Sequence, residues 1–78
     1  MPMLYFFNII EGSVEIPDPE GTDLPSWEAA QEEAAAVVRE LSREFPGRFG
    51  SRSVLEVVTG CGRRVMALPI RGHWYSLT

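Results

Sequence analysis

The segment Ser26–Glu44, SWEAAQEEAAAVVRELSRE, carries the clearest structural pattern in this chain of 78 residues. Apolar residues recur in it, and just beyond it, mostly at intervals of three and four: Trp27, Ala30, Ala34, Val37, Val38, Leu41 and Phe45. At 3.6 residues per turn these positions form one stripe along a helix, away from most of the charged residues. The segment predicts an amphipathic helix over about 26–44, with Ser26 as its N-cap.

The segments on either side of this helix have strand patterns. Four runs are rich in aromatic and β-branched residues: Met3–Ile10, Val14–Ile16, Ser53–Thr59 and Arg64–Ile70. Glycine-containing turns at Gly12 and at residues 60–63 join them into two hairpins. Residues 17–25 contain three prolines, and we expect them to form an ordered loop.

The order of these elements predicts the fold class. A hairpin, a helix and a second hairpin close most simply into an α+β fold of the ββαββ type, with a four-stranded, mainly antiparallel sheet. The helix at about 26–44 then packs on one face of the sheet. We expect a single small domain over residues 1–78, in which residues 71–78 form a C-terminal tail.

The first strand is apolar on both of its faces. Tyr5, Phe7 and Ile9 alternate with a second set that includes Leu4, Phe6 and Ile10, and the pattern leaves open which set meets the helix. One helix covers only one face of a sheet. A contiguous apolar patch on the other face indicates an interaction surface. The aromatic residues of the C-terminal tail could belong to the same surface. The candidate interface residues are therefore Leu4, Phe6 and Ile10 of the strand, with Trp74 and Tyr75 of the tail.

Charge and composition narrow the classes of function. The net charge is −4, with eight acidic and no basic residues in 1–38, but all seven arginines and three acidic residues in 39–78. The arginine-rich end could attract an anion or the acidic end of a second copy. The single cysteine excludes an intrachain disulfide. No signal peptide or membrane-spanning run is visible, so we expect a cytoplasmic protein.

Few residues have the spacing that catalysis or metal binding requires. Asp18, Glu20 and Asp23 share one loop, but their spacing does not match an EF-hand, and we expect no metal site. Cys61 and His73 fall at opposite ends of the last strand, beyond hydrogen-bond reach for a nucleophile and its base. We therefore expect no catalytic residue, no cofactor and no enzymatic activity.

Parts of the chain resemble two known families. The strand at Tyr5–Phe7, the loop IPDPEGTDLP over 16–25 and the hairpin from Leu55 to Leu68 resemble a family of small bacterial proteins known only as a domain of unknown function. This resemblance implies a shared fold and no established activity; members often have His at position 8 and an acidic residue at 61. The loop and the start of the helix also resemble HicB-type antitoxins, over about a quarter of the chain.

Three functional hypotheses follow. The first is a non-enzymatic module for protein interaction that forms a homodimer through the sheet face opposite the helix. The second is an antitoxin-like inhibitor whose acidic half binds a small basic toxin. The third is a weak nucleic-acid binder, which requires five arginines to converge into one basic patch. The negative net charge of the chain disfavours this hypothesis. The five arginines are Arg48, Arg52, Arg63, Arg64 and Arg71.

Overall fold

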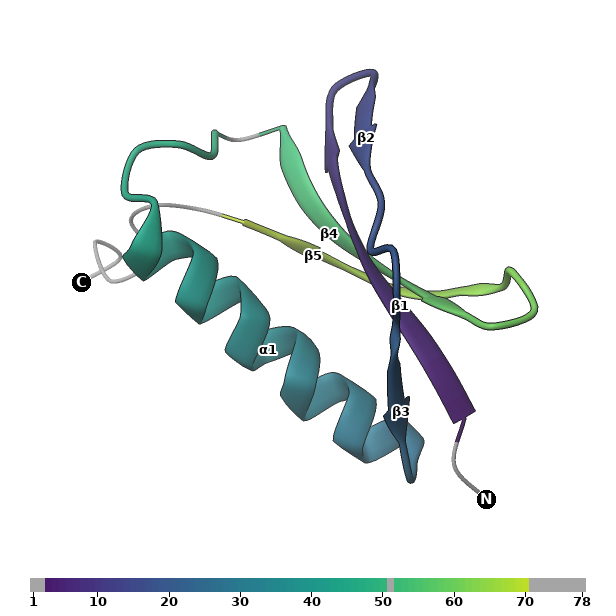
Figure 1. The fold of residues 1–78 in the computed structure, drawn as a ribbon. Coiled ribbons are helices and arrows are strands. Elements are labelled where there is room, and N and C mark those ends of the chain that lie inside the picture. The colour runs from purple at the N-terminus through teal and green to yellow at the C-terminus, as the bar shows by residue number, and fades with distance from the viewer. Residues whose placement is uncertain (1–2, 51, 71–78) are drawn as a thin grey trace.

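The computed structural model describes residues 3–50 and 52–70, in which one helix packs on one face of an antiparallel sheet (Figure 1). The elements are β1 (Met3–Glu11), β2 (Val14–Ile16), β3 (Thr22–Leu24), α1 (Trp27–Glu44), β4 (Ser53–Thr59) and β5 (Arg64–Pro69). The α+β class, both hairpins and the helix are confirmed. The order is βββαββ, because part of the predicted loop forms the additional short strand β3.

Strand β1 lies in the interior of the sheet, as its two apolar faces predict. The sheet has the order β2-β1-β4-β5, and all its pairings are antiparallel. One edge of β1 pairs with β4 over residues 5–11. The other edge is shared, since β2 pairs with Ile9–Glu11 and β3 pairs with Met3–Tyr5. The middle of that edge is left to residues 17–21.

The carboxylate of Asp18 occupies this gap between β2 and β3. Its Oδ2 accepts a hydrogen bond from the backbone N–H of Phe7 at 3.2 Å, where a neighbouring strand would offer a carbonyl oxygen. The N–H of Asp18 in turn donates to Oδ1 of Asn8 at 2.8 Å. Oδ1 of Asp18 accepts from the N–H groups of Glu20 and Gly21. One side chain therefore both completes the edge of β1 and shapes the loop.

Gly21 returns the chain from this loop to the sheet. It has a φ of +75°, and a Cβ at this position would lie 3.0 Å from Cε2 of Phe6 and 3.1 Å from the carbonyl oxygen of Tyr5. A larger residue would be strained in its backbone and crowded by its neighbours. The close approach places β3 directly beside β1.

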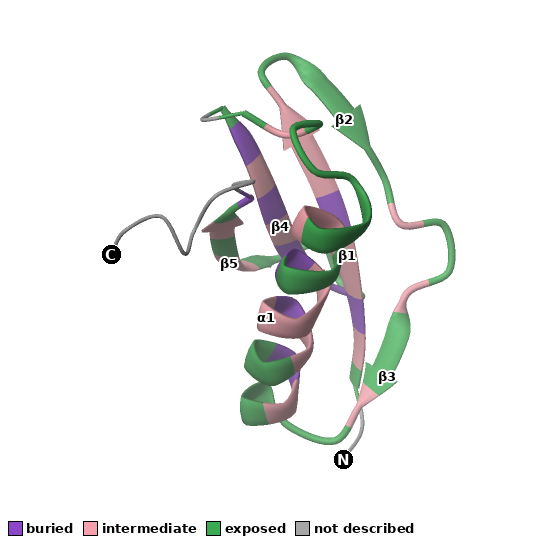
Figure 2. Cartoon of the chain, turned by 90° about the vertical axis from the view of Figure 1, so that its left-hand side faces the viewer, coloured by how far each residue is buried: buried purple, intermediate pink, exposed green. Residues whose placement is uncertain are grey.

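The helix begins and packs as its sequence predicts. Ser26 is the N-cap, and its Oγ accepts from the N–H of Ala29 at 3.1 Å. Ala30, Ala34 and Val38 are buried against the sheet, where the small alanines allow the helix to approach closely. Figure 2 shows these buried positions on the side of α1 that faces β4 and β1. Their partners in the core include Leu55 and Val57 of β4.

The two ends of the predicted apolar stripe are exceptions. Trp27 is 39% exposed and Phe45 is 53% exposed, although the interior of the stripe is buried or half-buried. Trp27 is the first residue of α1 and Phe45 is its C-cap, so both lie at the margins of the contact with the sheet. The sheet therefore covers the middle of the stripe and leaves both of its ends exposed.

The hydrogen bonds of Asp18 predict a measurable contribution to stability. Asp18→Ala removes the acceptor for three backbone N–H groups, and we expect it to lower the free energy of unfolding by about 1–3 kcal/mol. Asp23→Ala is the matched control, because Asp23 is exposed in β3 and accepts no side-chain hydrogen bond among the described residues. Urea denaturation of both variants provides the comparison. Equal losses in the two variants would contradict the role given to Asp18.

Candidate interaction surface

The face of the sheet that points away from α1 is the candidate functional surface. Tyr5 belongs to the core under the helix, and Phe7 and Ile9 pack against that core. The alternate residues of β1 therefore point to the opposite side, and the strand register adds residues from β4 and β5 to them. We call this surface the open face; its apolar members are Leu4, Phe6, Ile10, Val54, Val58, Ala67 and Pro69.

The open face has no second layer within residues 3–50 and 52–70. Figure 1 shows α1 on one side of the sheet and no described helix or strand on the other. The members from β1 and β4 are half-buried, whereas Ala67 and Pro69 are exposed. The loop at Gly21 touches Leu4 and Phe6 from the side, and both remain partly accessible.

Polar side chains on the open face have partners within the sheet. Asn8 is only 9% exposed, and the loop N–H of Asp18 satisfies its Oδ1. Oε2 of Glu56 in β4 accepts from Nη1 of Arg64 in β5 at 3.2 Å. One oxygen of each of these two side chains is thus paired, which lowers the cost of removing this face from water.

Charges of opposite sign lie along the two margins of the open face. Glu15 of β2 pairs in register with Ile10, and Asp23 of β3 pairs with Leu4, so both acidic residues share this face at one margin. Arg64 lies at the other margin, where its side chain is 66% exposed. The described part of the face therefore carries two acidic side chains along β2 and β3 and one basic side chain, that of Arg64, along β5.

The structure unites part of the predicted interface. Leu4, Phe6 and Ile10 share the open face, whereas Trp74 and Tyr75 lie outside the described residues. Sequence reasoning missed the contributions of β4 and β5. The alternation of side chains along a strand places Val54 and Val58 on the same face of β4. Only the strand register shows that this is the open face.

An ion pair anchors the chain between α1 and β4. Nη1 of Arg48 donates to Oε2 of Glu11 at 2.6 Å, and Oγ of Ser53 donates to the same oxygen at 3.3 Å. The hydrogen bond from Arg48 lowers the pKa of Glu11 below its ordinary value of 4.5, although partial desolvation opposes the shift. Two of the five arginines considered for nucleic-acid binding, Arg48 and Arg64, thus have carboxylate partners.

The remaining candidates for chemistry are dispersed. Cys61 is exposed in the turn between β4 and β5, with Sγ 3.5 Å from Oγ1 of Thr59, and His73 lies outside the described residues. In the part of the chain that the structure describes, no three His, Cys, Asp or Glu residues gather as metal ligands. The helix α1 is not apolar enough to cross a membrane.

Comparison with known proteins identifies one relationship. A family model described as a domain of unknown function, DUF6894, matches residues 4–71, which confirms the resemblance to an uncharacterised domain family. Comparisons with curated proteins and with solved structures found no match.

The lowered pKa of Glu11 predicts how stability depends on pH. A carboxyl group with a lower pKa in the folded state stabilises the protein fully above its unfolded pKa, and the contribution is lost as the pH falls through the folded pKa. Glu11→Gln should therefore unfold more easily than the wild type at pH 7, and the difference should shrink progressively below pH 4.5. Thermal unfolding as a function of pH measures it.

The matched control for this pH series is Glu32→Gln. Glu32 is exposed on α1, away from the open face, and has no ion-pair partner among the described residues. Its substitution should leave the shape of the pH profile close to that of the wild type. A difference between wild type and Glu11→Gln that does not change with pH would contradict the assigned role of the Glu11–Arg48 pair.

Proposed function

We propose that this chain, which belongs to the DUF6894 family of domains of unknown function, is a non-enzymatic interaction module. In this proposal it forms a homodimer through the open face. The proposal rests on one observation: within the described residues, a single helix covers one face of a sheet that has two apolar faces. The second copy supplies the layer that α1 supplies on the other side.

The size of the chain and of the face supports this arrangement. A domain of this length buries only about 60% of the surface that its unfolded chain exposes, so an additional apolar contact is a common source of stability. The seven apolar members of the open face come from three neighbouring strands, so a second copy can cover them as one surface.

The chemistry of the face fits a partner that is itself apolar. Phe6, Ile10 and the two valines of β4 that lie on this face, Val54 and Val58, offer branched and aromatic side chains, which pack well between sheets. Asn8 and Glu56 interrupt them. Hydrogen bonds within the chain already satisfy Oδ1 of Asn8 and Oε2 of Glu56, which lowers the cost of covering these two residues.

The charges at the margins favour a second copy as the occupant. In a face-to-face dimer, a two-fold axis parallel to the strands places the β2 and β3 margin of one copy over the β5 margin of the other. Glu15 and Asp23 then lie near the partner copy's basic margin, which carries Arg64. A surface that complements itself in this way suits a homodimer.

The test is sedimentation equilibrium at micromolar concentration. We expect a mass near twice that of the 8.7 kDa chain. Phe6→Lys places a charge in the centre of the open face and should shift the protein to monomer, because an unpaired charge is costly to bury. Phe45→Lys is the matched control, since Phe45 is exposed at the end of α1, away from the open face, and this variant should remain dimeric.

Three outcomes would overturn the proposal. A wild-type protein that sediments as an 8.7 kDa monomer does not form this interface. Dissociation of both variants, with circular dichroism spectra that show both still folded, would place the interface beyond the open face. A dimer that neither substitution disturbs is joined elsewhere, for instance at the edge of β5.

A further inference from the structure

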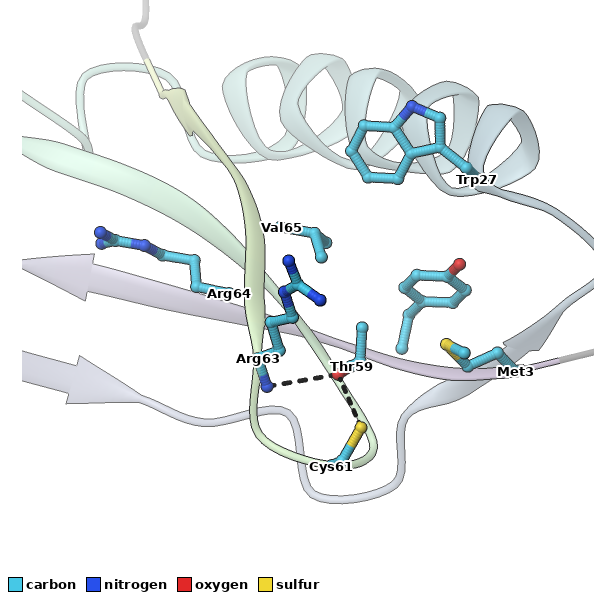
Figure 3. A pocket seen from close by; sticks show the side chains of 8 residues that line it. Met3, Trp27, Thr59, Cys61, Arg63, Arg64 and Val65 are labelled. Atoms are coloured by element: carbon cyan, nitrogen blue, oxygen red, sulfur yellow. Dashed lines mark hydrogen bonds between the residues drawn. The ribbon is translucent and has the colours of Figure 1, made fainter.

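A hollow of about 530 Å³ lies at the N-terminal end of α1, on the opposite side of β1 from the open face. It forms where β1 and α1 begin and where the turn joins β4 to β5, and the side chains around it are shown in Figure 3. Small-molecule sites typically have volumes of about 300–1,000 Å³. The hollow is therefore large enough for a small organic ligand.

One part of its lining is apolar. Met3, Trp27 and Val65 line the hollow, and both Met3 and Trp27 are large apolar residues that remain exposed. Figure 3 shows the indole of Trp27 on the side of the hollow nearest the helix and Met3 beside the start of β1. An exposed tryptophan beside a concavity offers a flat surface on which an aromatic or acyl group can stack.

The opposite part of the lining carries a cation. Arg63 has no ion-pair partner among the described residues, and Figure 3 shows its guanidinium directed toward the side of Trp27. Its backbone is held in place, because its N–H donates to Oγ1 of Thr59 and its carbonyl accepts from the N–H of Thr59. The neighbouring Arg64 also lines the hollow, but Figure 3 shows its side chain directed away from Trp27, and its guanidinium pairs with Glu56.

Tyr5 provides a second hydrogen-bond donor. It lines the hollow and is only 6% exposed, yet no described residue bonds to its hydroxyl group. Every fully buried side-chain oxygen or nitrogen in the described part of the chain has a partner. The hydroxyl therefore reaches solvent, and it does so at the hollow. A nearly buried phenol that no described residue pairs is suited to bind a ligand atom.

We infer that this hollow binds a small organic acid with a flat apolar body. The carboxylate accepts hydrogen bonds from the Arg63 guanidinium and the Tyr5 hydroxyl, and the apolar body lies against Trp27 and Val65. We assign a carboxylate because neither donor has a partner among residues 3–50 and 52–70, and one of the two is cationic. The site and the open face use opposite sides of β1, so this inference does not depend on dimerisation.

The experiment is an NMR titration of ¹⁵N-labelled full-length protein with 2-naphthoate, with the neutral amide 2-naphthamide as the matched ligand control. We expect saturable shifts of the Trp27 indole N–H and the Arg63 side-chain N–H with naphthoate, and at least about tenfold weaker binding of the amide. The spectrum of Trp27→Phe identifies the Trp27 signal, since the chain has a second tryptophan.

Two substitutions test the two donors. Arg63→Gln should weaken naphthoate binding about tenfold or more, whereas Arg64→Gln, the same change on the adjacent residue, should leave it within about twofold. Tyr5→Phe retains the ring in the core and should weaken binding about threefold to tenfold. The inference is wrong if naphthoate gives no saturable shift, if the amide binds equally well, or if Arg63→Gln and Arg64→Gln have the same effect.

Discussion

The structure depends on the fact that β1 is apolar on both faces while the described chain provides a single helix. Alternation along β1 sends Tyr5, Phe7 and Ile9 toward α1, where two buried alanines let the helix approach the sheet closely. The same alternation sends Leu4, Phe6 and Ile10 to the open face. The central strand therefore both organises the core and creates the surface that we assign to a second copy.

The loop before the helix solves a different problem, which is how two short strands can share one edge of β1. Neither β2 nor β3 reaches the middle of that edge. Asp18 bonds the free N–H of Phe7 with a side chain, and Asn8 returns the contact through its amide oxygen. The loop is thereby held against β1, and it delivers the chain to Ser26 in position to begin the helix.

The two proposed surfaces can function independently because they lie on opposite sides of β1. Met3 and Tyr5 contribute to the hollow on the helix side, and Leu4 and Phe6 contribute to the open face. The two adjacent arginines divide in the same way: Arg64 pairs with Glu56 on the open face, and Arg63 faces the hollow. A dimer formed through the open face would leave the hollow accessible to a ligand.

Local periodicity was enough to predict the helix, its N-cap and both hairpins, because spacing and turn chemistry are properties of neighbouring residues. It also indicated that Leu4, Phe6 and Ile10 share a face, since that follows from a period of two. Which set meets the helix, the contribution of Val54 and Val58, and the role of Asp18 depend on strand register. Strand register pairs residues that are far apart in the chain, and the hollow likewise brings together Tyr5, Trp27 and Arg63 from three distant segments. Only the tertiary structure therefore determined these features, because no local pattern relates such residues.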